Sequence, residues 1–76
     1  MNRPLTYGEK AVGLTFNPSK NLEVDDIKRK FADIIDVLHD SIDSNNTERT
    51  RMLKIAITEA QSSQMWAVKA ITWSLT

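Results

Sequence analysis

Apolar residues recur through the middle of the chain at spacings of three and four, which is the period of one face of an α-helix. The stripe consists of Val24, Ile27, Phe31, Ile34, Leu38 and Ile42, and it is widened by Ile35 and Val37. Asp25 and Asp26 fall in the expected first turn, where carboxylates favour the positive end of the helix dipole. The pattern predicts a first long helix over residues 24–42.

A polar stretch over residues 43–47 interrupts this pattern. Its Asp, Ser, Asn and Thr residues bond their own backbone and favour turns and caps. A second apolar stripe follows, through Leu53, Ala56, Ile57 and Ala60. With Asn46 or Thr47 as its cap, this stripe predicts a second long helix over residues 47–74. A short turn between two long helices makes an antiparallel hairpin.

The end of the second helix is apolar on nearly every side. Eight of the eleven residues from Met65 to Leu75 are apolar, and only Lys69, Thr72 and Ser74 break the run. A helix of this kind must be buried nearly all round, and one partner helix cannot cover it. The N-terminal segment can cover part, and neighbouring subunits the rest. The alternative is a C-terminus packed wholly within the monomer. We expect a homo-oligomer.

The first 20 residues differ from the hairpin, because both glycines and both prolines of the chain lie within the first 18. The run Thr6-Tyr7-Gly8-Glu9 matches the capping box S/T-x-x-E and predicts a short helix that ends near Gly13. An ordered loop then leads into the first long helix. The expected fold is therefore all-α, one domain over residues 1–76. It has an N-terminal helix and loop in 1–20, followed by the antiparallel two-helix hairpin.

Composition narrows the function classes. A chain of 76 residues is marginally stable alone, and it has no cysteine and one histidine, so disulfides and Cys- or His-rich metal sites are excluded. Ten basic and ten acidic residues give no net charge, and so no field that would gather DNA, RNA or an anionic membrane. The sequence shows neither a signal peptide nor an apolar window that could span a bilayer. We expect a cytoplasmic protein.

Acidic residues are the first candidates for catalysis. Asp33, Asp36 and Asp40 share a helical face and in principle could hold Mg²⁺. The simpler interpretation is a solvated polar face, because basic residues are interleaved with them: Lys28, Arg29 and Lys30. The E-x-x-E patterns of helical nucleotide pyrophosphatases are absent. His39 has no Ser or Cys partner and is interpreted as a partly exposed helical residue. We expect no catalytic residue, no metal and no cofactor.

The N-terminal segment is locally basic within the neutral chain. Tyr7 and Phe16 add aromatic rings, and two glycines allow a ligand or a backbone to come close. Ser19 and Lys20 can bind phosphate and Tyr7 can stack on a base, a combination that suits a nucleotide. The alternative, which the residues alone favour, is that Tyr7 and Phe16 only staple the N-terminal helix onto the hairpin.

The segment Tyr7–Ser19, with its Gly13-Leu14-Thr15-Phe16-Asn17-Pro18-Ser19 end, resembles the N-terminal signature of phage anti-CBASS cyclic-nucleotide sponges. The same hairpin occurs in some phage anti-Thoeris sponges, and residues 56–60 and 65–73 resemble theirs. The resemblance implies a compact homo-oligomer, a hexamer, that binds cyclic dinucleotides between subunits. Some members also bind cyclic trinucleotides in separate pockets on a symmetry axis. They hold the immune messenger without degrading it.

The resemblance also suggests residues. Tyr7 matches the tyrosine that stacks on a base, and Lys20 the lysine that contacts phosphate. The predicted pocket is lined by Gly8, Phe16, Asn17, Pro18 and Ser19. Arg49, Arg51 and Lys54 are basic candidates for a second ligand site. Two other functions stay open: a helical module that docks onto a protein through Trp66 and Trp73, and a small helical nucleotide hydrolase.

Overall fold

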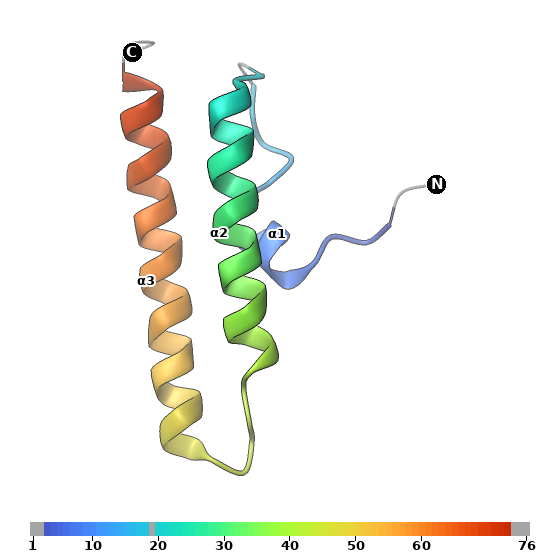
Figure 1. Cartoon of the computed structure of the whole chain (residues 1–76), viewed down its shortest axis with the longest axis vertical. Coiled ribbons are helices and arrows are strands. Elements are labelled where there is room, and N and C mark those ends of the chain that lie inside the picture. Colours follow the sequence, from blue (N-terminus) through green and yellow to red (C-terminus); the bar gives the residue numbers. More distant parts are fainter. Residues whose placement is uncertain (1–2, 19, 74–76) are drawn as a thin grey trace.

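The structure is a computed structural model that describes residues 3–18 and 20–73. It contains three helices, α1 (Tyr7–Ala11), α2 (Leu22–Asp40) and α3 (Thr47–Ile71). In Figure 1, α2 and α3 run antiparallel side by side, and the short α1 lies on the opposite side of α2 from α3. The predicted all-helical fold, a short helix followed by a helical hairpin, is confirmed.

Asparagine caps set where the two long helices begin. The Asn21 side chain accepts from the backbone N–H groups of Glu23 and Val24, so α2 starts two residues before the predicted residue 24. It also ends two residues before the predicted residue 42. Asn46 caps α3 by accepting from Arg49 N. This helix ends at Ile71, while the predicted end at residue 74 lies outside the described residues.

The capping box predicted for α1 is confirmed. Glu9 N donates to Thr6 Oγ1 at 3.1 Å, and Thr6 N donates to Glu9 Oε1 at 2.8 Å. The Arg3 guanidinium donates two further hydrogen bonds to the Glu9 carboxylate. The bonds from Arg3 and the one from the Thr6 backbone lower the pKa of Glu9 from 4.5 to about 2. Gly13, with φ of +63°, then turns the chain away from the helix.

The buried face of α2 agrees with the predicted stripe in part: Val24 and Ile35 are buried, and Phe31, Leu38 and Ile42 pack against the core. The buried residues of the helix are Val24, Lys28, Ala32 and Ile35. Ile35 is fully buried, whereas Ile34, expected in the stripe, is 52% exposed. The reason is that α2 packs against α1 on one side and α3 on the other, so no single stripe describes its contacts. Val12, Leu14 and Ile57 complete the buried cluster.

Gly8 lets the backbone of α1 lie directly on α2. A Cβ atom at this position would lie 2.1 Å from the carbonyl oxygen of Ala32, far inside van der Waals contact. Gly8 N also donates a hydrogen bond of 2.7 Å to Asp36 Oδ1. The absence of a side chain therefore serves the packing of two helices. No helix within residues 3–18 and 20–73 combines the length and apolarity needed to cross a membrane.

Candidate functional site

Tyr7, the first residue of α1, packs its ring face to face on that of His39. The two ring centroids are 4.0 Å apart and the ring planes differ by 9°. His39 belongs to the last turn of α2, and Tyr7 remains 47% exposed despite the contact. The sequence offered no partner for His39, and the structure supplies one from a helix 32 positions earlier in the chain.

The Tyr7 pocket, as we call it, lies beside this ring pair and has a volume of about 250 Å³. It is lined by Tyr7, His39, Ile42, Lys54, Ile57, Thr58 and Gln61. Two aromatic rings, two aliphatic side chains, one cation and two neutral polar groups thus border one depression. Lys54, a candidate for the second ligand site, therefore shares a pocket with Tyr7, a candidate for the first.

Lys28 of α2 anchors the loop that follows α1. Its ammonium is buried and donates to the carbonyl oxygens of Gly13 at 3.0 Å and Phe16 at 2.5 Å. The same Nζ lies 5.7 Å from the centre of the Phe16 ring. Burial lowers the pKa of Lys28, and the nearby Asp25 carboxylate opposes that shift. The assignment of Lys28 to a solvated polar face was wrong, because this loop covers that part of α2.

Asn17 binds the same loop to the start of α2. Its side-chain amide donates to Asn21 O at 2.8 Å and to Asp25 Oδ1 at 3.1 Å, and its Oδ1 accepts from Asn21 N. Lys20 N donates to Asn17 O, and Lys20 adopts the left-handed backbone region with φ of +54°. The loop between these anchors leaves the Lys20 side chain exposed.

A second pocket, which we call the loop pocket, has a volume of about 200 Å³. It is lined by Phe16, Asn17, Pro18, Val24, Lys28, Val68 and Thr72. The loop pocket and the Tyr7 pocket share no lining residue. Of the predicted ligand residues, Tyr7 thus lines one pocket and the loop residues 16–18 line the other, whereas Gly8 and Lys20 line neither. Phe16 is 72% exposed, and Ser19 lies outside the described residues.

The basic residues at the start of α3 differ in the hydrogen bonds that their side chains make. Arg49 donates to Ser41 O at 3.3 Å, and Arg51 donates two hydrogen bonds to the Glu48 carboxylate. The contact with Arg51 lowers the pKa of Glu48 and raises that of Arg51. Arg51 and Lys54 both border two shallow depressions of about 290 and 350 Å³ on this end of the helix.

The aspartates of α2 do not act as one group. Asp36 is half-buried and accepts the hydrogen bond from Gly8 N, so its assignment to a solvated face was also wrong. Asp33 and Asp40 are exposed. Across residues 3–18 and 20–73, no three His, Asp or Glu side chains come together in an arrangement that could hold a metal ion.

The family model described as Acb2/Tad1, hairpin domain, matches residues 9–72. The chain belongs to the Acb2/Tad1 hairpin family. This is the family of the anti-CBASS and anti-Thoeris sponges, so the predicted resemblance is confirmed. The match includes Lys20, Lys28 and His39, whereas Tyr7 and Gly8 precede it. A comparison with curated proteins and one with solved structures each gave no match.

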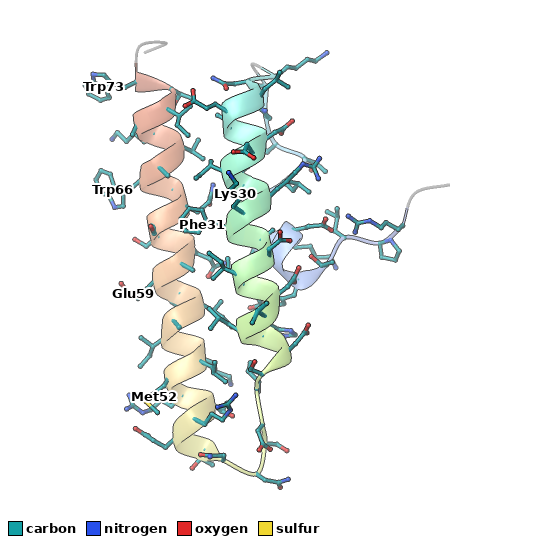
Figure 2. All side chains as sticks on the ribbon, viewed as in Figure 1. Lys30, Phe31, Met52, Glu59, Trp66 and Trp73 are labelled. Atoms are coloured by element: carbon teal, nitrogen blue, oxygen red, sulfur yellow. The ribbon has the colours of Figure 1, made fainter. Side chains whose placement is uncertain are left out.

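In this Acb2/Tad1 hairpin, three exposed apolar side chains and one glutamate lie along one side of α3 and the turn that follows it. Met52, Glu59, Trp66 and Trp73 follow one another at intervals of seven residues, and Figure 2 shows all four extending from the side of α3 that faces away from α2. We call this the outer face of α3. Met52 is 53% exposed, Trp66 68% and Trp73 67%. The Lys69 ammonium lies 5.5 Å from the centre of the Trp66 ring.

The structure of this Acb2/Tad1 hairpin shows contacts of Lys28 and His39 that were not predicted from the sequence. Lys28 stands four residues after Val24 and four before Ala32, both buried, so its position on the helix already placed it on the inner face. That spacing was the available signal. His39 had no comparable signal, because its contact with Tyr7 depends on how α1 docks.

Proposed function

We propose that this protein binds cyclic oligonucleotide immune messengers, cyclic dinucleotides and also cyclic trinucleotides, and sequesters them without degrading them. In this way it counters bacterial anti-phage signalling. The observation that carries the proposal is the match of residues 9–72 to the Acb2/Tad1 hairpin family. Binding without turnover is consistent with the position of Asp36, a candidate acidic residue whose carboxylate accepts a hydrogen bond from Gly8 N and so serves the fold.

The geometry around Tyr7 supports a nucleotide ligand. A ring that is 47% exposed, with its plane already set by a second ring, offers a surface on which a base can stack. We assign Tyr7 to the base and Lys20 to the phosphate. The loop residues Phe16, Asn17, Pro18 and Ser19 line the site, with Gly8 allowing α1 to lie close to α2. The second ligand class is assigned to the basic end of α3, through Arg49, Arg51 and Lys54.

We further propose that the complete site lies between two copies of the chain. In one chain, Tyr7 and the loop of Phe16 border separate pockets. A cyclic dinucleotide has two bases and two phosphates, so a two-fold pair of subunits can present the same residues to both halves. The outer face of α3 supports self-association, because three large apolar side chains on it are more than half exposed in the single chain. We propose a homohexamer.

The exposed Trp66 and Trp73 also favour one other function, a helical module that docks onto another protein and binds no nucleotide. This alternative uses the outer face of α3 for a foreign partner and leaves the Tyr7 pocket without a ligand. The two functions therefore differ in what they predict for small-molecule binding.

Calorimetric titration with a panel of cyclic di- and trinucleotides tests the proposal. We expect saturable binding of at least one member, unaffected by EDTA. The loaded protein is then denatured by heat and the released ligand is separated by chromatography. Recovery of intact ligand supports sequestration, whereas recovery of a linear product would make the protein a hydrolase. If no member of the panel binds, the docking module is favoured.

A further inference from the structure

The rings of Tyr7 and His39 stack beside a pocket, the Tyr7 pocket that both of them line. The centroid distance of 4.0 Å and the interplanar angle of 9° place the two rings in nearly parallel contact. Such a contact limits the rotation of both side chains, since each ring blocks movement of the other across its face.

The backbone around Tyr7 is fixed from the same region of α2. Gly8 N, one residue after Tyr7, donates to Asp36 Oδ1 at 2.7 Å, and Asp36 precedes His39 by three residues. Residues three apart lie on the same side of a helix. One face of α2 therefore sets both the backbone position of Tyr7, through Asp36, and its ring plane, through His39.

The stack is open rather than buried. Tyr7 is 47% exposed, and the side chain of His39 is 42% exposed. Both rings border the Tyr7 pocket, which also contains Lys54. A ring pair that served only to pack α1 onto α2 would not need this exposure, because the contacts of Gly8, Val12 and Leu14 already secure that packing.

We propose that His39 is a positioning residue for the ring of Tyr7, so that a bound base forms the third layer of a base–Tyr7–His39 stack. This inference rests on the proposed function, in which Tyr7 stacks on the ligand. Its physical basis is preorganisation. A side chain that is already ordered before binding loses less conformational freedom when the ligand arrives. His39 thereby contributes to affinity by holding the ring of Tyr7 from the face opposite the base.

Three substitutions separate ring packing from other roles. His39→Ala removes the ring, His39→Phe keeps a flat aromatic ring without its nitrogens, and His39→Gln keeps polar atoms without aromaticity. We expect His39→Ala and His39→Gln to weaken cyclic dinucleotide binding by roughly threefold to tenfold for each copy of the site. A two-fold ligand meets two copies, so the total is about tenfold to a hundredfold. His39→Phe should restore binding to near the wild-type level.

A measurement without ligand tests separately whether the rings of Tyr7 and His39 stack in the free protein. Tyr7 is the only tyrosine of the chain, so its ring proton resonances can be assigned without ambiguity. In the free protein we expect these resonances to shift in His39→Ala, because the ring current of the neighbouring imidazole is lost. Asp40→Asn is the matched control. Asp40 is exposed and its Oδ1 lies 3.9 Å from His39 Nδ1, so this change alters the charge beside the stack but keeps both rings.

The outcomes differ clearly. Weak binding in His39→Ala and His39→Gln, rescue in His39→Phe and no change in Asp40→Asn support the inference. Wild-type affinity in His39→Ala, or rescue by Gln instead of Phe, overturns it. If Tyr7→Ala binds as tightly as wild type, or no cyclic nucleotide binds at all, the proposed ligand site itself fails. In that case, the shifted Tyr7 resonances in His39→Ala would still report a stack whose role is packing alone, which also overturns the inference.

Discussion

The N-terminal segment and α3 are held in opposite ways. The segment from Arg3 to Lys20 is tied to α2 by side-chain hydrogen bonds, from Lys28 to two loop carbonyls and from Gly8 N to Asp36. In α3 the hydroxyl of Thr58, and that of Thr72 at its C-cap, donate to carbonyls one turn earlier in the same helix. Its largest side chains, Trp66 and Trp73, extend away from the hairpin (Figure 2).

This difference indicates which surfaces are complete in one chain. Polar anchors have specific geometry, so a segment fixed by them keeps its shape before any ligand binds. An exposed apolar ridge has no such anchor, and removing it from water requires a partner. We therefore expect the N-terminal segment to serve the ligand and the outer face of α3 to serve assembly. The following predictions test this division.

The largest expected effect comes from Trp66→Glu. Trp66 is 68% exposed in the single chain, so the substitution should leave the hairpin folded. In the assembly it would replace a buried apolar ring with a buried charge, which costs several kcal/mol. A loss of about 4 kcal/mol raises the dissociation constant about a thousandfold. Light scattering at micromolar concentration should then report the 8.6 kDa monomer instead of an oligomer. Ligand binding should fall as well, because the proposed site needs two subunits.

Arg29→Glu is the control for this substitution, since it changes the charge of an exposed residue on α2. It should leave the assembly intact. A wild-type protein that is monomeric at micromolar concentration would contradict the assignment of the outer face of α3, and so would an oligomer that survives Trp66→Glu.

The ligand residues should give the next largest effects. Stacking on an aromatic ring is worth roughly 1–3 kcal/mol per base, and a two-fold ligand meets Tyr7 twice. Tyr7→Ala should therefore weaken cyclic dinucleotide binding by roughly 2–6 kcal/mol, about thirtyfold to more than ten-thousandfold. Lys20→Ala should weaken binding by a similar order of magnitude, and it should make binding less dependent on salt concentration. Titration calorimetry measures both.

Lys30→Ala is the matched control for Lys20→Ala, because Lys30 is an exposed lysine of α2 paired with Asp26 at 2.9 Å. It should bind like wild type. Neither ligand variant should alter the oligomer, since both residues belong to the N-terminal segment. If Tyr7→Ala and Lys20→Ala bind as tightly as Lys30→Ala, the pocket lies elsewhere, and Tyr7 and Phe16 only pack.

Gly8→Ala should destabilise the anchored segment by about 1–3 kcal/mol, the usual cost of forcing extra atoms into a packed contact. The new Cβ atom would lie 2.1 Å from Ala32 O, and a backbone atom in a helix cannot move aside. Urea unfolding measures the loss. Gly13→Asn is the control, because no atom lies within 4 Å of a Cβ at Gly13 and asparagine tolerates its φ of +63°. Equal stability of Gly8→Ala and wild type would show that α1 can shift on α2.

The sequence predicted the helices well because their signals are local. The capping box of Thr6 and Glu9, the cap at Asn46 and the polar stretch over 43–47 each depend on residues a few positions apart. The buried face of α2 was predicted only in part, because the stripe included Val24 and Ile35 but lacked Lys28 and Ala32. Lys28 is buried because the loop after α1 covers it. The apolar periodicity within one helix carries no information about such a contact with another segment.

The candidate site likewise combines residues that the sequence predicted with contacts between helices that it did not. Tyr7 and Lys20 came from a resemblance in the N-terminal segment, and their role stays a prediction. Neither the stack of Tyr7 on His39 nor the approach of Lys54 to the same pocket could be predicted, because both join residues of different helices. Such contacts are set by the way α1 packs on α2, and this close packing is possible because Gly8 has no side chain.

Lys28→Met tests the anchor of the loop more gently, since methionine keeps most of the packing but removes the ammonium. The carbonyls of Gly13 and Phe16 would lose their donor, which should cost about 1–3 kcal/mol. We expect faster hydrogen exchange at the amides of Phe16 and Lys20, whose hydrogen bonds lie within this loop. Lys30→Met, an exposed substitution on the same helix, should leave both amides unchanged. Unchanged exchange in Lys28→Met would mean that Asn17 alone holds the loop.

The smallest expected effect is a pH dependence at the start of α1. Arg3 and the Thr6 backbone hold the pKa of Glu9 at about 2, below its ordinary 4.5, so the folded state favours the ionised carboxylate. The stability that this contributes is complete above pH 4.5 and is lost as the pH falls through about 2. The thermal midpoints of wild type and Glu9→Gln should therefore differ at neutral pH and converge near pH 2. The gap should be modest, because the Arg3 side chain is 63% exposed and water screens the pair. Glu23→Gln, an exposed change in the first turn of α2, is the control. A gap between wild type and Glu9→Gln that persists unchanged at pH 2 would assign the stability to the shape of the capping box and not to its charge.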